Sequence, residues 1–397
     1  MIVVKVIDIV KKIRGYDKKE NIYTNGEDNA YPEITDRLIN NSVTAKMCSS
    51  LMVQYLIGKG FKKEVNELII NEKEQITLQD YSEHLAEEIV NNRGVFIHVN
   101  YKANDAGIYE PIDPKVLPFD WCRVGEKDDN MYNSKILMKV DWSDTKKKAV
   151  KFDVYNPKQI VIKKQIENAG GIEKYKGQVF YYNKDAKSFY PLSRIDAVMG
   201  DCDSEAQSSV YKNQLLRKGF FGKTLIVVRP LVDSAVEEEI LDQATGNTIP
   251  NPAYAKEESE AEEVRDSLEE FIGAEQAGGA MVVEMDNAGD KLEDTILVKN
   301  IEANIDADMF QGVEKSVREN ILIAFNNLPI GLVTESEGMF SNSGEALLEM
   351  KRSYWENTEK ERAAFYRILN KFSKIILPEV TLEPVPIVPP RPEAPAE

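Results

Sequence analysis

The sequence is poor in the residues that build metal centres, disulfide frameworks and thiol catalysis. Its 397 residues include only three cysteines, Cys48, Cys122 and Cys202, and two histidines, His84 and His98. The cysteines are odd in number, widely spaced and form no CxxC pair, which favours free thiols in a reducing compartment. No HxxxH or HExxH spacing is present, so a histidine-based metal site would need other ligands to complete it. We therefore expect no metal, no cofactor and no disulfide framework.

Long apolar runs are also lacking. No stretch approaches 18 consecutive apolar residues, so we expect no membrane-spanning helix. The N-terminal segment MIVVKVIDIVKKIRG is interrupted by Lys5 and Asp8. This pattern predicts a strand or a short helix there, and not a signal peptide.

Signatures of catalysis are scarce. The sequence has no GxSxG nucleophile elbow, and its many carboxylates single out no catalytic pair. One GKT triplet, Gly222-Lys223-Thr224, resembles the end of a phosphate-binding loop. The GxxxxGK[ST] pattern would require a glycine at 217, where the chain has Arg217, and a helix after the threonine, where a strand is predicted. We expect no enzymatic activity.

Positive charge is in deficit. The formal net charge is −17, which argues against a protein that coats DNA through a broad basic face, but is compatible with a channel whose walls repel a polyanion. Residues 231–275 hold 14 acidic and two basic residues, a net charge of −12. A charge run is usually a solvated face, and the alternative is a docking surface for a basic partner.

What is present predicts an α+β protein. Apolar periodicity indicates two helices within residues 29–57 and one over 77–92. Between Val95 and about Pro191, five short β-rich runs follow one another: VFIHVNY, KILMKVDW, KAVKFDVY, QIVIKK and QVFYYN. The tyrosines and tryptophans of this region are expected to fill its core and rim.

The second half alternates helices with strands. We expect helices over 203–219 and 306–327, a strand ending at Pro230, and a strand, a turn and another strand within 278–299. A Gly/Ser-rich loop follows, and then one long helix over 344–376. Seven of the last 20 residues are proline, so residues 377–397 are expected to be extended or disordered.

Four stretches, in this order, resemble the portal proteins of tailed bacteriophages, in particular the compact portals of the HK97-like and SPP1-like type. They cover most of residues 30–376. Each pattern alone is degenerate, and their order and spacing carry the resemblance. The stretches are NSVTAKMCSSLMVQYLIGKGF, SSVYKNQLLRKGFFGKTLIVV, VRDSLEEFIGAEQAGGAMVVE and NNLPIGLVTESEGMFSNSGEALLEMKRSYWE.

The resemblance implies a portal fold: a ring, usually of twelve subunits, at one capsid vertex, through which double-stranded DNA is packaged and ejected. The chain departs from the family in a longer, more acidic clip and in a proline tail where a larger crown could stand. The implied parts are a wing (1–200), stem helices (203–219 and 306–327), a clip (220–300), a tunnel loop (328–344), a supporting helix with a short crown (345–376) and a Pro-rich tail (377–397).

The resemblance also assigns two candidate surfaces. The first is a tunnel loop that points into the DNA channel and whose glutamates would repel phosphate. Its residues are Thr334, Glu335, Ser336, Glu337, Gly338, Met339, Phe340 and Ser341. The second is a clip surface for docking partners, formed by Glu257, Glu258, Glu260, Glu262 and Glu263.

The implied partners are further copies of the chain, the terminase large subunit, a head–tail adaptor, the major capsid protein, scaffolding protein and the DNA. The implied location is the virion, and the host cytoplasm during assembly. Two alternatives stay open: another virion connector ring, and a nucleotide-binding enzyme that uses Lys223 and Thr224. An ordinary interhelix loop is the simpler interpretation of residues 334–341.

Overall fold

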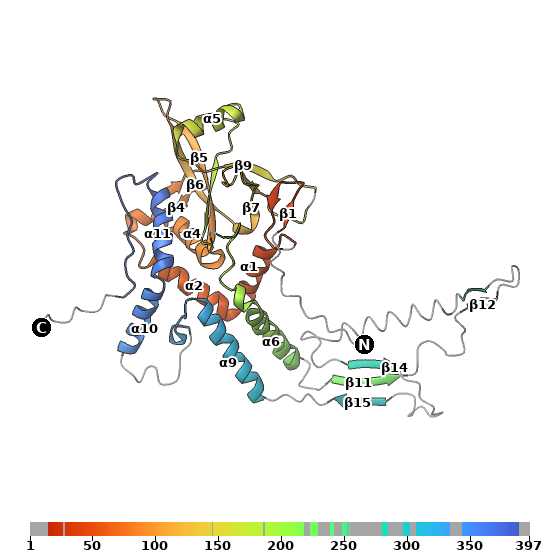
Figure 1. The fold of residues 1–397 in the computed structure, drawn as a ribbon. Helices are drawn as coiled ribbons and strands as arrows, with labels where there is room; N and C mark the ends of the chain where they lie inside the picture. Colours follow the sequence, from red (N-terminus) through yellow and green to blue (C-terminus); the bar gives the residue numbers. More distant parts are fainter. Residues whose placement is uncertain are drawn as a thin grey trace. The chain divides into compact units, whose positions relative to one another are not determined.

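The computed structural model describes residues 15–217 except 27, 145 and 186, and residues 223–228, 239–241, 248–251, 254, 280–284, 297–301, 307–333 and 344–388. The chain divides into two compact units (Figure 1). The first combines residues 1–203 with 315–397, and the second comprises residues 204–314. Helices accompany a mixed six-stranded sheet, so the predicted α+β class is confirmed.

Two consecutive helices follow a small hairpin at the start of the first unit. Pro32 lies in the first turn of the first helix, where its missing N–H breaks no hydrogen bond. Ser42 separates the two helices, and its hydroxyl accepts a hydrogen bond from the Ala45 N–H. The two helices predicted within 29–57 are confirmed. These elements are β1 (Tyr16–Asp17), β2 (Ile22–Tyr23), α1 (Tyr31–Asn41) and α2 (Val43–Ile57).

The predicted 77–92 helix is α4 (Leu78–Asn92), and it begins with a capping box. The Thr77 hydroxyl accepts from the Asp80 N–H, and the Asp80 carboxylate accepts from the Thr77 N–H. The apolar face of α4 includes Tyr81 and Leu85, which are buried in the larger hydrophobic cluster. The short elements before α4 are α3 (Lys63–Asn66), β3 (Ile69–Asn71) and β4 (Ile76–Thr77).

The six-stranded sheet has the order β6-β5-β10-β9-β8-β7. Every neighbouring pair is antiparallel except β10 and β9, which are parallel. The 3-10 turn η1 (Phe119–Trp121) lies between β6 and β7 in the sequence, and η2 (Asp196–Val198) follows β10. The strands are β5 (Gly94–Ala103), β6 (Tyr109–Leu117), β7 (Cys122–Val124), β8 (Ile136–Met138), β9 (Val150–Val154) and β10 (Gln178–Asn183).

One of the five predicted β runs is wrong. QIVIKK belongs to helix α5 (Gln159–Ala169), which ends at Gly170 in the left-handed conformation with φ 83°. Parallel strands need a crossover connection, usually a helix, and α5 supplies it between β9 and β10 (Figure 1). Ile162 and Ile166, four residues apart, are the buried side chains of α5, so the apolar period is helical.

The sheet separates two hydrophobic clusters. Along β5, Val95, Ile97 and Val99 join the larger cluster, whereas Phe96 joins the smaller one. This alternation follows from the two-residue period of a strand. The larger cluster also contains the apolar faces of α2, α4 and α11, and the smaller one is filled by aromatic residues such as Phe119 and Tyr190.

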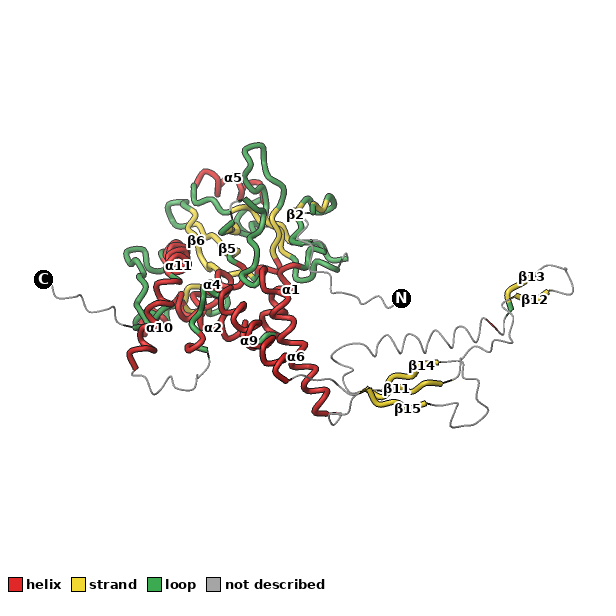
Figure 2. The backbone as a smooth tube through the Cα atoms, turned by 60° about the horizontal axis from the view of Figure 1, so that its bottom comes forward, coloured by secondary structure: helices red, strands yellow, loops and turns green. Residues whose placement is uncertain are grey.

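The predicted 306–327 helix is α9 (Ala307–Ala324), and the single helix predicted over 344–376 is wrong. The chain forms α10 (Gly344–Asn357) and α11 (Glu359–Ser373), separated by Thr358 (Figure 2). The Thr358 hydroxyl donates to the Tyr354 carbonyl, and the Asn357 carbonyl accepts a hydrogen bond from the Asn326 side chain. These contacts interrupt the helix for one residue.

The described part of the Pro-rich tail, residues 377–388, begins with a turn and packs against the rest of the first unit. The Asn370 side chain exchanges hydrogen bonds with the backbone N–H and carbonyl of Leu382. The Lys59 N–H donates to the Val385 carbonyl. A side chain on Gly58, which has φ 75°, would place its Cβ 2.3 Å from that carbonyl oxygen. Glycine at 58 therefore permits the contact.

The second unit contains a three-stranded sheet with β11 in the centre. β11 pairs in parallel with β14 and antiparallel with β15. Lys212 of α6 and Glu314 of α9 form an ion pair within this unit. The expected strands are confirmed, and the turn predicted within 286–289 lies outside the described residues. The elements are α6 (Met199–Arg217), β11 (Lys223–Val228), β12 (Glu239–Leu241), β13 (Thr248–Pro250), β14 (Ala280–Glu284) and β15 (Leu297–Ile301).

Candidate functional site

The candidate site is the junction where α9 ends and the chain turns towards residues 334–343. Asn326 and Asn327 both have left-handed backbone conformations, with φ 60° and 53°. Asparagine adopts this conformation more readily than most residues. The Leu328 N–H donates to the Leu322 carbonyl, and Pro329 follows. The chain then forms η4 (Ile330–Leu332) before it leaves the described region at Val333.

The Asn326 side chain holds this junction in place. Its Oδ1 accepts from Arg194 Nη1 at 2.9 Å, and its Nδ2 donates to the Asn357 carbonyl at 3.1 Å. The hydroxyl of Tyr354, which is fully buried, donates to the Phe325 carbonyl at 3.0 Å. The end of α9 is thus tied to the C-terminal turn of α10. Residues 334–343, which lie outside the described part of the chain, follow η4 and precede α10 in the sequence.

Arg194 connects this junction to the rest of the first unit. Its guanidinium donates to the Val90 carbonyl at the end of α4 and lies 3.8 Å from Glu361 at the start of α11. Lys184 contacts the same Glu361 carboxylate at 2.6 Å. Burial alone would raise the pKa of Glu361, but the hydrogen bond from Lys184 and the charges of Lys184 and Arg194 outweigh it and lower the pKa below its usual range.

A groove of about 380 Å³ lies beside the junction. Ile323 is 62% exposed and Ile330 43% exposed at its edge, whereas Leu328 is buried at its floor. Glu319 of α9 and Ser353 and Asn357 of α10 complete its rim. Such a surface can accommodate apolar side chains.

Both predicted surfaces lie outside the described residues. The tunnel-loop residues Thr334–Ser341 fall within the gap 334–343, and the clip residues Glu257–Glu263 fall within the gap 255–279. The structure describes the helices on either side of the first gap. Asn326, Tyr354, Arg194 and Glu361 were not predicted. Only Asn326 carried a sequence signal, because an Asn-Asn-Leu-Pro sequence after an apolar helix face predicts a helix stop.

The GKT triplet does not form a phosphate-binding loop. Lys223 and Thr224 open strand β11, and they pair with Ile301 and Asn300 of β15. A phosphate-binding loop places this Lys-Thr pair at the N-terminus of a helix. Here the strand begins at the lysine itself, so the backbone N–H groups that would bind phosphate belong to a sheet.

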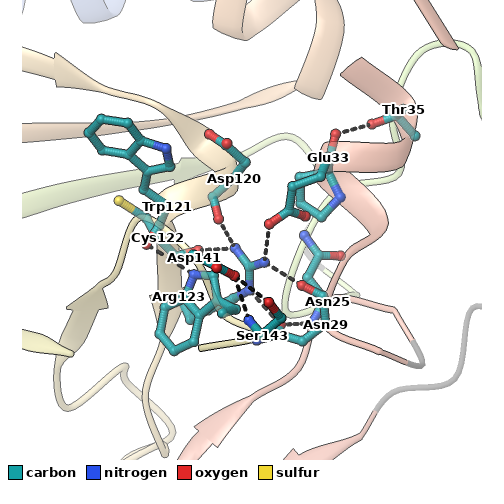
Figure 3. A network of polar contacts seen from close by, with 12 residues as sticks. Asn25, Asn29, Glu33, Thr35, Asp120, Trp121, Cys122, Arg123, Asp141 and Ser143 are labelled. Carbon is teal, nitrogen blue, oxygen red and sulfur yellow. Dashed lines mark hydrogen bonds and ion pairs between the residues drawn. The ribbon is translucent and has the colours of Figure 1, made fainter. Parts of the chain in front are cut away.

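A second buried polar cluster surrounds Arg123, which is fully buried (Figure 3). Its guanidinium donates to the Asn29 side chain and carbonyl, each at 2.5 Å, and to the Asp120 carbonyl at 2.6 Å. Glu33 lies 3.6 Å away, and the Trp142 ring centroid lies 5.1 Å away. Every strong donor direction faces protein oxygen, so this arginine stabilises the fold and is not available to bind a substrate.

The cysteines are unsuited to nucleophilic chemistry. Cys48, Cys122 and Cys202 are buried and not joined in disulfides, and burial raises the pKa of the Cys122 thiol. Within the described residues, no group of three or more His, Cys, Asp and Glu side chains is placed to hold a metal ion. None of the helices in the described part of the chain is long and apolar enough to span a membrane.

No family model and no curated protein matches the sequence. Among solved structures, the chain is similar to one from the "virion of native gene transfer agent (GTA) particle", with 15% identity, a TM-score of 0.43 and coverage of 86% of this chain and 79% of that one. It is similar to one from the "neck of native GTA particle computed with C12 symmetry", with 14% identity, a TM-score of 0.46 and coverage of 87% and 79%.

A third similar structure is an HK97 family phage portal protein from Corynebacterium diphtheriae. The identity is 8%, the TM-score is 0.36, and the match covers 79% of this chain and 82% of that one. Because all three TM-scores are below 0.5, none of these superpositions carries weight in assigning a function to this chain.

Proposed function

We propose that this chain is the subunit of a portal-type ring at one capsid vertex, a conduit for double-stranded DNA during packaging and ejection. The observation that carries the proposal is the junction at Asn326. The Asn326 and Tyr354 hydrogen bonds tie α9 to α10, the helices that precede and follow residues 334–343 in the sequence. The four portal-like stretches of the sequence lead to this junction in order.

Residues 334–343 have the composition that a channel loop needs. Residues 334–343 include two glutamates, one glycine and three serines, and no basic residue. Phosphate contacts are strong and salt-dependent, so a conduit that must let DNA slide should avoid cationic side chains. In this proposal, Thr334–Ser341 line the channel, and α6 and α9 form the stem.

The acidic stretch 231–275 is the proposed docking surface of the clip. Its net charge of −12 suits a basic partner, here the terminase motor during packaging and an adaptor afterwards. Reversing Glu257, Glu258, Glu260 and Glu262 to lysine is expected to weaken binding to such a partner and to leave the fold of the first unit unchanged. Unchanged affinity would reduce this stretch to a solvated face.

The first test is the mass and shape of the purified protein, by light scattering and negative-stain microscopy. Rings of about a dozen 45.0 kDa subunits with a central hole are the expected result. If the protein is monomeric, assembly with the capsid and scaffolding proteins is tested next. A chain that stays monomeric in their presence and hydrolyses ATP would overturn the proposal and favour the nucleotide-binding alternative.

The channel role is tested on the assembled ring. Deletion of 334–341 is expected to leave rings intact, because the hydrogen bonds of Asn326 and Tyr354 remain, and to impair DNA packaging or retention. Loss of assembly would show that these residues are a structural element. Normal packaging would leave them an ordinary interhelix loop.

A further inference from the structure

The segment 146–176 has a positive net charge, whereas the chain as a whole is negatively charged. It contains nine lysines and three acidic residues, a net charge of 9 − 3 = +6 in a protein with a net charge of −17. All nine lysines are exposed. They are Lys146, Lys147, Lys148, Lys151, Lys158, Lys163, Lys164, Lys174 and Lys176.

The nine lysines lie along the parallel β9–α5–β10 connection or directly before it in the sequence; Figure 1 shows where these elements lie in the first unit. Asp153 of β9 pairs with Gln178 of β10. Lys151 and Lys176 each stand two residues before this pair, on neighbouring segments. The stretch 146–148 leads directly into β9, and Lys174 lies on the return from α5 to β10. Six of the nine lysines are therefore at the amino ends of two adjacent strands.

Helix α5 extends the same surface. Lys163 and Lys164 lie on its outward side together with Ile160, which is 77% exposed, while Ile162 and Ile166 face the core. Lys158 is the residue directly before the helix. Lys371 of α11 adds a further cation, with its ammonium 4.7 Å from the ring centroid of Tyr155, at the end of β9. We call the nine lysines the lysine face.

The positive charge of the lysine face is not neutralised within the protein. Across the described part of the chain, none of the nine ammonium groups forms an ion pair with a carboxylate within 4.0 Å. The lysines that do form such pairs, for example Lys63, Lys115 and Lys184, all lie elsewhere. A concentration of unpaired cations of this kind attracts a polyanion, and at 0.1 M salt only charges within a Debye length of about 10 Å weaken that attraction strongly.

The composition of the face distinguishes between two polyanionic partners. Protein–protein interfaces are enriched in arginine and exposed aromatic residues and depleted in lysine. The segment 146–176, which carries the lysine face, has no arginine. Its two tyrosines, Tyr155 and Tyr175, are half-buried. Within this segment, Ile160 is the one large apolar side chain that is exposed. Lysines that have no exposed aromatic or arginine neighbours suit a surface that contacts DNA phosphates and makes no contacts to the bases.

We propose that the lysine face binds the phosphate backbone of duplex DNA without regard to sequence. The proposal concerns a surface of the first unit that is separate from residues 334–341, and it does not depend on ring formation. It also refines the expectation drawn from net charge, since a chain of net charge −17 can still hold DNA at one local face.

The test measures binding of a fluorescently labelled random-sequence duplex of about 30 base pairs to the full chain, by anisotropy between 50 and 200 mM salt. The variant Lys163→Gln/Lys164→Gln/Lys176→Gln is compared with Lys18→Gln/Lys19→Gln/Lys62→Gln. The control removes the same charge from exposed lysines outside the face. Thermal melting of both variants should match the wild type, because all six side chains are exposed.

We expect the face variant to bind about tenfold or more weakly at 100 mM salt and to reduce the slope of log affinity against log salt by up to about 3, while the control changes little. Equal losses in both variants, or no duplex binding by the wild type at 50 mM salt, would overturn the proposal. Binding of a polyglutamate peptide in place of DNA would also overturn it and would indicate an acidic protein partner.

Discussion

Two of the buried arginines of the first unit, Arg123 and Arg194, have their hydrogen-bonding groups satisfied in different ways. Arg123 is satisfied mainly by neutral oxygens of Asn29, Asp120 and Cys122. Arg194 instead joins segments far apart in sequence, from Val90 to Asn326 and Glu361. The Arg123 cluster fixes the sheet to the turn before α1, whereas the Arg194 cluster holds the C-terminal helices on which residues 334–343 depend. The Arg123 cluster stabilises the fold, and the Arg194 cluster positions the candidate site.

The largest effect is expected from breaking the Arg123 cluster. Arg123→Met should lower the free energy of unfolding by about 3–5 kcal/mol, because the carbonyls of Asn29 and Asp120 would be left buried without donors. Arg123→Lys should rescue little, since one ammonium cannot replace the planar guanidinium. Urea unfolding followed by circular dichroism measures this.

Arg37→Met, at an exposed position of α1, is the matched control and should change stability by less than about 0.5 kcal/mol. A similarly small loss for Arg123→Met would mean that the guanidinium contacts contribute little to stability.

A smaller effect is expected at the Arg194 cluster. Asn326→Ala should cost about 2 kcal/mol, because it removes two hydrogen bonds and places a Cβ-bearing residue without side-chain compensation at φ 60°. Asn326→Gly accepts this φ and should lose only the hydrogen-bond part. The measurement is the urea unfolding midpoint, followed by circular dichroism.

Asn327→Gly is the control for this position, since Asn327 shares the left-handed backbone but lies at the groove instead of on Arg194. If Asn327→Gly destabilises as much as Asn326→Gly, the Arg194 contact is not what fixes the junction.

The smallest expected effects are on the pH dependence of stability, because a carboxyl beside each cluster titrates differently. Glu88, whose carboxylate accepts from the Phe119 N–H next to the Arg123 cluster, has no cation to offset its burial, and burial raises its pKa to about 8. Its stabilising contribution is present below about pH 4.5 and is lost as the pH rises to about 8. Glu361 has a lowered pKa, so its contribution is present above about pH 4.5 and is lost as the pH falls.

Thermal melts between pH 4 and pH 9 should therefore show opposite trends. Glu88→Gln is expected to be more stable than the wild type at pH 8–9 and to converge with it near pH 5. Glu361→Gln should be less stable at pH 7, and the difference from the wild type should begin to shrink as the pH falls below about 4.5. Parallel curves for both variants would show that these carboxyls titrate alike and that the two clusters do not differ in charge compensation.

The sequence predicted the long helices well, because α2, α4 and α9 carry apolar faces and recognisable ends. It failed where tertiary contacts decide. Residues 159–164 have the β-branched composition of a strand, but the parallel pairing of β9 and β10 requires a crossover helix there. Thr358 splits a continuous helical pattern because the Asn357 carbonyl is held by Asn326, 31 residues away in sequence.

The site was predictable only in outline. A helix stop at Asn326-Asn327-Leu328-Pro329 can be read from the residues, but its partners Arg194 and Tyr354 cannot, since nothing local marks an arginine or tyrosine as buried. The lysine face had a local signal. A count of charges over 146–176 separates it from the acidic remainder, whereas the whole-chain net charge conceals it.

The position of β10 in the sheet sets an order of events during folding. The hairpin β5–β6 and the meander β7–β8–β9 each pair strands that are close in sequence, so each can form early. β10 alone joins them, pairing residues 178–183 with residues 94–99, and the entropy of closing that loop must be met before the two halves unite. During synthesis the sheet therefore remains in two parts until the ribosome has delivered β10, and substitutions in this strand should slow folding more than equally destabilising ones in β7.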